Sequence, residues 1–198
     1  RALPIGLLIL MLTRQLPNGR WWWRAFVLGS LNIGMFFPLL FVAAYRLPGG
    51  VAATIGAVQP LLVALLSWVL LSEAMSKLRF LAAGLGVAGV ALLVLKPEAR
   101  FDQFGILAAL VATGLMAIGT VLGKRWGRPV PLMSFTAWQL VAGGILLLPI
   151  AFLVEGLPPA LNMMNMIGLL YLGVVNTGMA YACWFFGMQR LRATELSF

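Results

Sequence analysis

LGSLNIGMFFPLLFVAAYRL, residues 28–47, decides the fold, because the chain contains it a second time as LGVVNTGMAYACWFFGMQRL at residues 172–191. The two copies are identical at eight of 20 positions at a constant offset of 144, and both contain Asn-x-Gly-Met. Apolar composition alone gives matches at roughly one position in ten. The repeat therefore predicts a fold built from two related halves.

The composition is that of a membrane protein. Hydrophobic residues make up 62% of the 198 residues and charged residues only 10%, against about 25% charged in soluble domains. A helix of about 20 apolar residues crosses the hydrocarbon core of a bilayer. We therefore predict an all-α polytopic membrane protein embedded in the lipid bilayer, with apolar runs at 1–13, 22–45, 49–72, 79–96, 103–123, 130–153 and 165–188 and a further start at 193.

The net charge of +9 predicts orientation rather than nucleic-acid binding, because the basic residues lie in short connectors and form no stripe interleaved with aromatics. The opposite connectors hold only Arg46, Lys96 and Arg100. By the positive-inside rule, the richer side is cytoplasmic. The connectors predicted to be cytoplasmic are 14–24, 73–79, 124–129 and 189–193, and they contain ten of the 14 basic residues.

In this orientation the two copies cross the membrane in opposite directions, as in the inverted repeats of many secondary transporters. Four runs separate the copies, which predicts five helices per repeat and ten in the complete protein. About seven helices and the start of another are expected in this chain. The first repeat is predicted at 1–97, without its first helix and part of its second. The second is predicted at 102–198, without most of its fourth helix and its fifth.

Four stretches resemble the EamA-type members of the drug/metabolite transporter superfamily. They are RALPIGLL (1–8), AAYRLPGGVAAT (43–54), QPLLVALL (59–66) with Glu73 closing that helix, and GLGVAGVALL (84–93). The resemblance covers essentially the whole chain and implies a ten-helix inverted-repeat carrier of the bacterial inner membrane. Such carriers often export amino acids or other metabolites. The motifs do not specify the substrate.

Asn32 and Asn176 are the first candidates for a substrate-binding site. An amide side chain in hydrocarbon is costly unless it is hydrogen-bonded, so each must face protein or water. On an uninterrupted helix, Phe36 lies on the same face as Asn32. The pattern leaves two interpretations open, which are tight packing between helices and the wall of a substrate cavity.

Further candidates are the polar and aromatic side chains predicted to lie within the spans. Pro60 predicts a kink in the 49–72 helix, with the Gln59 amide beside it. Both residues fit either a packing kink or the lining of a cavity. Trp21, Trp22 and Trp23 follow a basic connector and are expected to be interfacial anchors. The side chains that could stack on or hydrogen-bond a substrate are Trp138, Gln139, Tyr181 and Trp184.

Residue types and motifs that the sequence lacks narrow the range of functions to consider. The chain has no histidine, one cysteine (Cys183) and no Gly-x-x-x-x-Gly-Lys-Ser/Thr motif. We therefore expect no catalytic residue, metal or cofactor. The predicted function is a secondary transporter that works by alternating access on a small-molecule substrate, exporting or exchanging amino acids or amphipathic compounds. The alternatives are a structural or assembly membrane protein and an intramembrane enzyme. The oligomeric state is left open.

Overall fold

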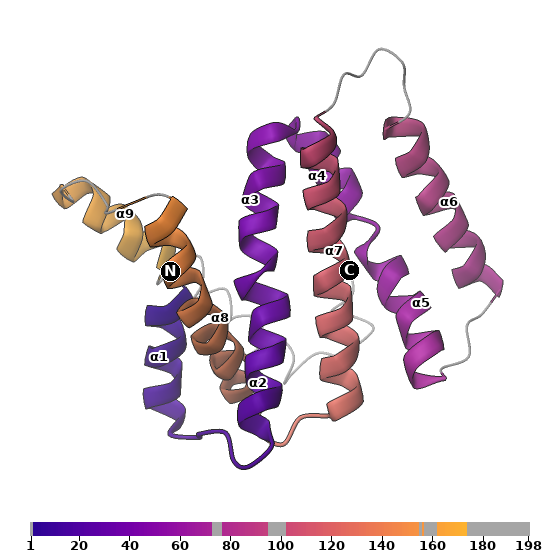
Figure 1. Cartoon of the computed structure of the whole chain (residues 1–198). Coiled ribbons are helices and arrows are strands. Elements are labelled where there is room, and N and C mark those ends of the chain that lie inside the picture. Colours follow the sequence, from indigo (N-terminus) through magenta and orange to yellow (C-terminus); the bar gives the residue numbers. More distant parts are fainter. Residues whose placement is uncertain (1, 73–76, 95–101, 155, 157–161, 174–198) are drawn as a thin grey trace. The chain divides into compact units, whose positions relative to one another are not determined.

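The computed structural model describes residues 2–72, 77–94, 102–154, 156 and 162–173, and the α-helices of these segments are labelled in Figure 1. Within these segments the chain forms helices and no strands. The fold is therefore the predicted all-α one. The elements are α1 (Ala2–Thr13), α2 (Trp21–Gly29), the π-helix η1 (Ser30–Gly34), α3 (Phe36–Arg46), α4 (Gly49–Gly56), α5 (Gln59–Leu71), α6 (Lys77–Val94), α7 (Gln103–Trp126), α8 (Leu132–Val154) and α9 (Met163–Gly173).

Four stretches of the described chain are long and apolar enough to cross a membrane: Trp21–Arg46, Gly49–Leu71, Gln103–Trp126 and Leu132–Val154. They agree with four of the predicted runs to within three residues at each end. Many of their large side chains are exposed, such as Leu107 and Phe152, as expected where lipid covers the surface. The predicted run at 165–188 is described only to Gly173, and the start at 193 lies outside the described residues.

The span Trp21–Arg46 is not the uninterrupted α-helix that the sequence predicted, because it widens into the π-helix η1. The Met35 N–H donates to the carbonyl of Ser30 over 2.8 Å, which is a bond from residue i+5 to residue i. Pro38 accounts for the position of the widening. It has no N–H for the carbonyl of Gly34, four residues earlier, and its ring clashes with that carbonyl.

The span Gly49–Leu71 is interrupted as well, where the sequence predicted a kink. α4 ends at Gly56, Ala57 and Val58 form a turn, and α5 begins at Gln59 with Pro60 in its first turn. A proline is tolerated in the first turn of a helix, where its missing N–H needs no partner. The break therefore lies immediately before Pro60.

The structure divides into two compact units, Arg1–Gly29 with Arg128–Phe198, and Ser30–Gly127. In the first unit, α8 packs against α1 and α2, and glycines allow the backbones to approach closely. A Cβ at Gly6 would lie 2.9 Å from the Cβ of Leu140, and a Cβ at Gly29 would lie 2.7 Å from the Cβ of Ala142. Small residues thus set this interface.

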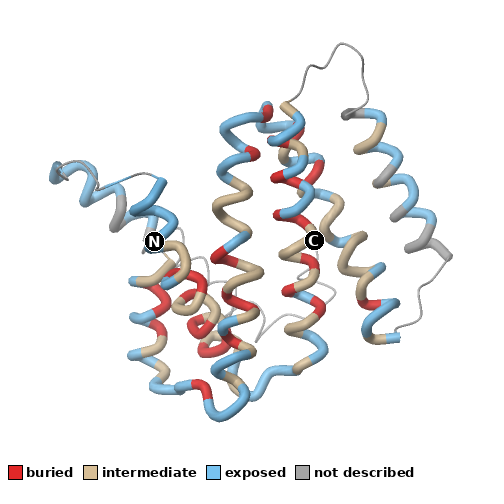
Figure 2. The backbone as a smooth tube through the Cα atoms, viewed as in Figure 1, coloured by how far each residue is buried: buried red, intermediate tan, exposed pale blue. Residues whose placement is uncertain are grey.

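In the second unit, α7 is the central helix and packs against α3, α4, α5 and η1. α3 and α7 lie side by side in Figure 1. Figure 2 shows buried positions recurring along α7. The hydrophobic core of this unit consists of Ala43, Leu47, Val51, Ile55, Ala108 and Ala109.

Each unit combines helices from both predicted repeats. In the first unit, α1 and α2 come from the predicted first repeat and α8 from the second; in the other unit, α3, α4 and α5 surround α7. The packing therefore interleaves the two halves of the sequence.

Candidate functional site

Asn32 is the central residue of η1. It lies eleven residues after Trp21 and fourteen before Arg46, so it is near the middle of this span. Its side chain is half-buried, and its Oδ1 atom is fully shielded from the surface. The structure therefore places an amide at mid-span, within a helical turn of a type that recurs at functional sites.

Gly119 of α7 makes room for this amide. A Cβ at position 119 would lie 2.8 Å from Asn32 Cγ and 3.1 Å from Nδ2, and closer still to Oδ1. Any side chain at this position would displace Asn32. Nothing in the spacing of Gly119 along the sequence singles it out as the partner of Asn32.

The other predicted site residues of this unit belong to α3 and α5, two helices that pack against α7. Phe36 in α3 is half-buried, with its ring centroid 5.4 Å from that of Phe37. Gln59 is half-buried at the start of α5, while Pro60 next to it is exposed. The expectation that Phe36 shares a face with Asn32 assumed an uninterrupted α-helix. The π-turn between them adds a residue and changes that register.

Trp138 and Gln139 belong to the other unit. Trp138 lies six residues after Leu132, which is about 9 Å along α8. It therefore lies within the span, as predicted, but nearer to one end than to the middle. It is buried, and its Nε1–H donates to the backbone carbonyl of Gln15 over 2.7 Å. Gln139 is half-buried, with Nε2 3.5 Å from the carbonyl of Phe135.

The indole of Trp138 belongs to an aromatic cluster with Trp21 and Phe135. The ring centroids lie 5.9 Å apart for Trp21 and Phe135, 6.2 Å for Trp21 and Trp138, and 6.4 Å for Phe135 and Trp138. Ser134 adds a hydrogen bond from its Oγ to Oε1 of Gln15 over 2.8 Å. These contacts hold the connector between α1 and α2 against the first turns of α8.

This cluster corrects the sequence interpretation of Trp21, which is half-buried and packs inside its unit, with Arg24 Cζ 5.0 Å from the centroid of its ring. Trp22 and Trp23 are exposed, as interfacial anchors should be. Sequence reasoning also overlooked Gln15, Ser134 and Phe135. The spacings of Phe135 and Ser134 from Trp138, three and four residues on one helix, were the available signal.

Three predicted site residues, Asn176, Tyr181 and Trp184, lie outside the described residues. The structure therefore describes one member of the predicted asparagine pair. Within the segments that it does describe, no group of three or more His, Cys, Asp or Glu side chains is arranged as a metal site.

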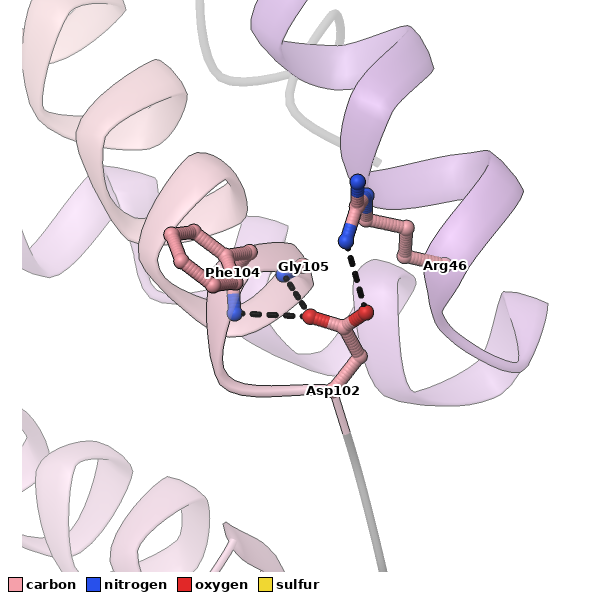
Figure 3. Close-up of polar contacts among 4 residues, drawn as sticks. All are labelled: Arg46, Asp102, Phe104 and Gly105. Carbon is pink, nitrogen blue, oxygen red and sulfur yellow. Dashed lines mark hydrogen bonds and ion pairs between the residues drawn. The ribbon is translucent and has the colours of Figure 1, made fainter.

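At the start of α7, Asp102 joins two helices of one unit (Figure 3). Its Oδ1 accepts hydrogen bonds from the backbone N–H groups of Phe104 (2.8 Å) and Gly105 (3.1 Å), and its Oδ2 lies 2.8 Å from Nη1 of Arg46 at the end of α3. The Gly105 N–H and the Arg46 guanidinium hold the pKa of Asp102 below its ordinary value. The carboxylate is therefore a charged N-cap outside the span.

Comparison with known proteins identifies the family. The model of the EamA-like transporter family matches residues 2–95 and 103–198. Protein PecM of Dickeya dadantii is 48% identical over 191 residues, which cover 96% of this chain and 64% of PecM. The chain is also 31% identical to the WAT1-related protein At3g02690, chloroplastic, of Arabidopsis thaliana over 216 residues, which cover all of this chain and 51% of that protein.

The uncharacterized transporter YoaV of Bacillus subtilis is 24% identical over 201 residues, which cover 99% of this chain and 69% of YoaV. The chain thus spans about half to two thirds of the length of these relatives. No solved structure is significantly similar to it. Both halves match the family model, and four described spans have membrane length: the chain is a multi-pass membrane protein that belongs to the EamA-like transporter family.

Proposed function

We propose that the protein is a secondary carrier that moves a small metabolite across the bacterial inner membrane by alternating access. The observation that carries this proposal is the pair of matches to one transporter family, which cover nearly the whole chain as two halves. Two related halves that cross the membrane in opposite directions can expose a shared site to each side in turn. The substrate class that we propose is amino acids or other small amphipathic metabolites.

The proposed substrate site is centred on Asn32. An amide at mid-span can donate and accept hydrogen bonds, so it suits a substrate with polar groups. Gly119 leaves the space in which this amide lies, and the half-buried Gln59 supplies a second amide in the same unit. In this proposal, the equivalent asparagine of the second copy, Asn176, provides the other half of the site.

The test has two stages. Culture media of cells with and without the complete gene are compared by mass spectrometry, and the compound that changes is then assayed for flux into vesicles containing the protein. Asn32→Leu should reduce that flux at least tenfold. This is the loss expected when a site built to hydrogen-bond a substrate loses one polar partner, about 1.4 kcal/mol or more.

Thr120→Val is the matched control. Thr120 lies next to Gly119, but its side chain is exposed and its Oγ1 donates to the carbonyl of Met116 on its own helix, over 2.8 Å. Its flux should equal that of the wild type. Unchanged flux in Asn32→Leu, in protein that inserts normally, would remove Asn32 from the site. No difference between the media and no flux of any compound would reject the carrier function.

A further inference from the structure

The chain crosses between its two compact units at two places, between Gly29 and Ser30 and between Gly127 and Arg128. Each unit has its own packed interior, formed around α8 in one and around α7 in the other. Any movement of one unit against the other must be taken up at these two crossings. Their backbone conformations therefore bear directly on how a carrier of this family changes state.

The first crossing is the start of the π-helix. η1 begins at Ser30, the first residue of its unit, and is followed by the turn at Met35. A π-turn holds one more residue than the α-turn it replaces, so closing or opening it rotates the helix on one side relative to the other. Pro38 lowers the cost of such a change, because it already leaves the carbonyl of Gly34 without an N–H donor four residues later.

The second crossing lies at Gly127, which ends α7 with φ +73° and ψ −172°. This combination is essentially restricted to glycine. A Cβ at this position would meet nothing within 4 Å, so no neighbouring group explains the glycine. The backbone conformation is what requires it.

We propose that η1 and Gly127 are the two hinges about which the units move during the transport cycle. Both are short segments at the ends of helices that can absorb a large change in backbone dihedrals. This proposal rests on the proposed carrier function and adds one feature to it. Asn32, the proposed substrate ligand, lies inside one of the two hinges, so a substrate held by its amide biases the conformation of that hinge.

The experiment measures distances between the units in the complete protein. After Cys183→Ser, spin labels are attached at Tyr45→Cys in one unit and Val154→Cys in the other, both highly exposed in the structure. A second pair, at Tyr45→Cys and Leu107→Cys, lies within one unit. Double electron–electron resonance spectroscopy should give two distance populations for the first pair of labels and one for the second pair.

Two hinge variants should shift the balance between the two populations. Gly127→Ala penalises the observed conformation and should change the population ratio about tenfold or more. Deletion of the exposed Met35 removes the extra residue of the π-turn while retaining Asn32, and should leave one population.

Gly156→Ala is the matched control. Gly156 has φ +74° and also has nothing within 4 Å of a built Cβ, but it does not lie at a crossing. Its population ratio should equal that of the wild type. If Gly156→Ala changes the population ratio as much as Gly127→Ala does, the effect at Gly127 is general backbone strain. That result would overturn the assignment of Gly127 as a hinge.

Amide hydrogen exchange of the unmodified protein tests the hinges without relying on variant folding. Amides of residues 30–35 should exchange faster than those of α2 and α3, and equal protection would overturn the proposal. A single narrow distance between the units, with and without substrate, would also overturn it. If the protein transports a solute while the distance between the units stays single, the hinges are rejected and the carrier function stands. If two distance populations are found but no compound is transported, the carrier function is rejected and the hinges stand.

Discussion

Asn32 and Gly119 lie so close together that a methyl group on Gly119 would be 2.8 Å from Asn32 Cγ. The contact joins η1 to α7 near the middle of a membrane span. Lipid tails are as apolar as the helix surfaces, so the hydrophobic effect does not drive helices together at this depth. Close packing against α7 at Gly119 therefore holds the polar side chain of Asn32.

Gly119→Ala should therefore destabilise the protein by about 1–3 kcal/mol, the usual cost of overpacking. Gly114→Ala provides the control on the same helix, because a Cβ at Gly114 meets nothing within 4 Å; it should be neutral or slightly stabilising. Thermal unfolding in detergent, followed by size-exclusion chromatography, measures both. Equal stabilities would show that Asn32 can move aside freely.

The hydrogen bond from the Gly105 N–H and the ion pair with Arg46 should together make stability depend on pH at the acidic end, through Asp102. Interactions in the folded state, first the hydrogen bond from the Gly105 N–H, lower the pKa of Asp102 below its ordinary value. The stabilisation is therefore fully present above the unfolded pKa and is lost as the pH falls through the folded value. Unfolding temperatures measured between pH 6 and pH 3 should decline less in Asp102→Asn than in the wild type.

Asp102→Ala separates the cap from the ion pair. Asparagine retains an oxygen for the N–H groups of Phe104 and Gly105, whereas alanine retains none. At pH 7 the loss of stability should thus be greater for Asp102→Ala than for Asp102→Asn. Equal losses would mean that the pair with Arg46, which both variants remove, dominates over the cap.

The connector between α1 and α2 should loosen when its hydrogen bonds to α8 are removed. Trp138→Phe and Ser134→Ala each remove one bond to Gln15, and each should cost about 1 kcal/mol of stability, with some additional packing loss for the tryptophan. Trp23→Phe makes the same exchange at an exposed site and should be neutral. Protease sensitivity of residues 14–20 gives a local readout, which should rise only in the first two variants.

Water should reach Gln59 if the protein is a carrier. With Cys183 replaced, Gln59→Cys should react with a charged, water-soluble thiol reagent, because a transport path must hydrate the side chains that line it. Val69→Cys on the same helix is exposed on the apolar surface of α5 and should be protected by lipid. The extent of labelling at each of the two positions is measured by gel shift. Protection of both positions would favour a structural or assembly protein.

Hydrophobic run length predicted most of the fold. Whether a segment can cross a bilayer depends on its own length and composition, which are local properties. The runs at 22–45 and 103–123 accordingly match Trp21–Arg46 and Gln103–Trp126 closely. Pro60 likewise marked the break between α4 and α5, because the lost hydrogen bond and the clash with the preceding turn are local.

The sequence alone thus determined the helical class, the positions of the spans and the membership of a repeat family. The tertiary structure decided that the amide of Asn32 lies against Gly119, that Trp21 packs with Phe135 and Trp138, and that each unit draws helices from both halves of the chain. In the span Leu132–Val154 the apolar residues favour no single side, so no stripe identifies its partner. Close packing of particular shapes selects the contacts, and that selection arises only when the helices meet.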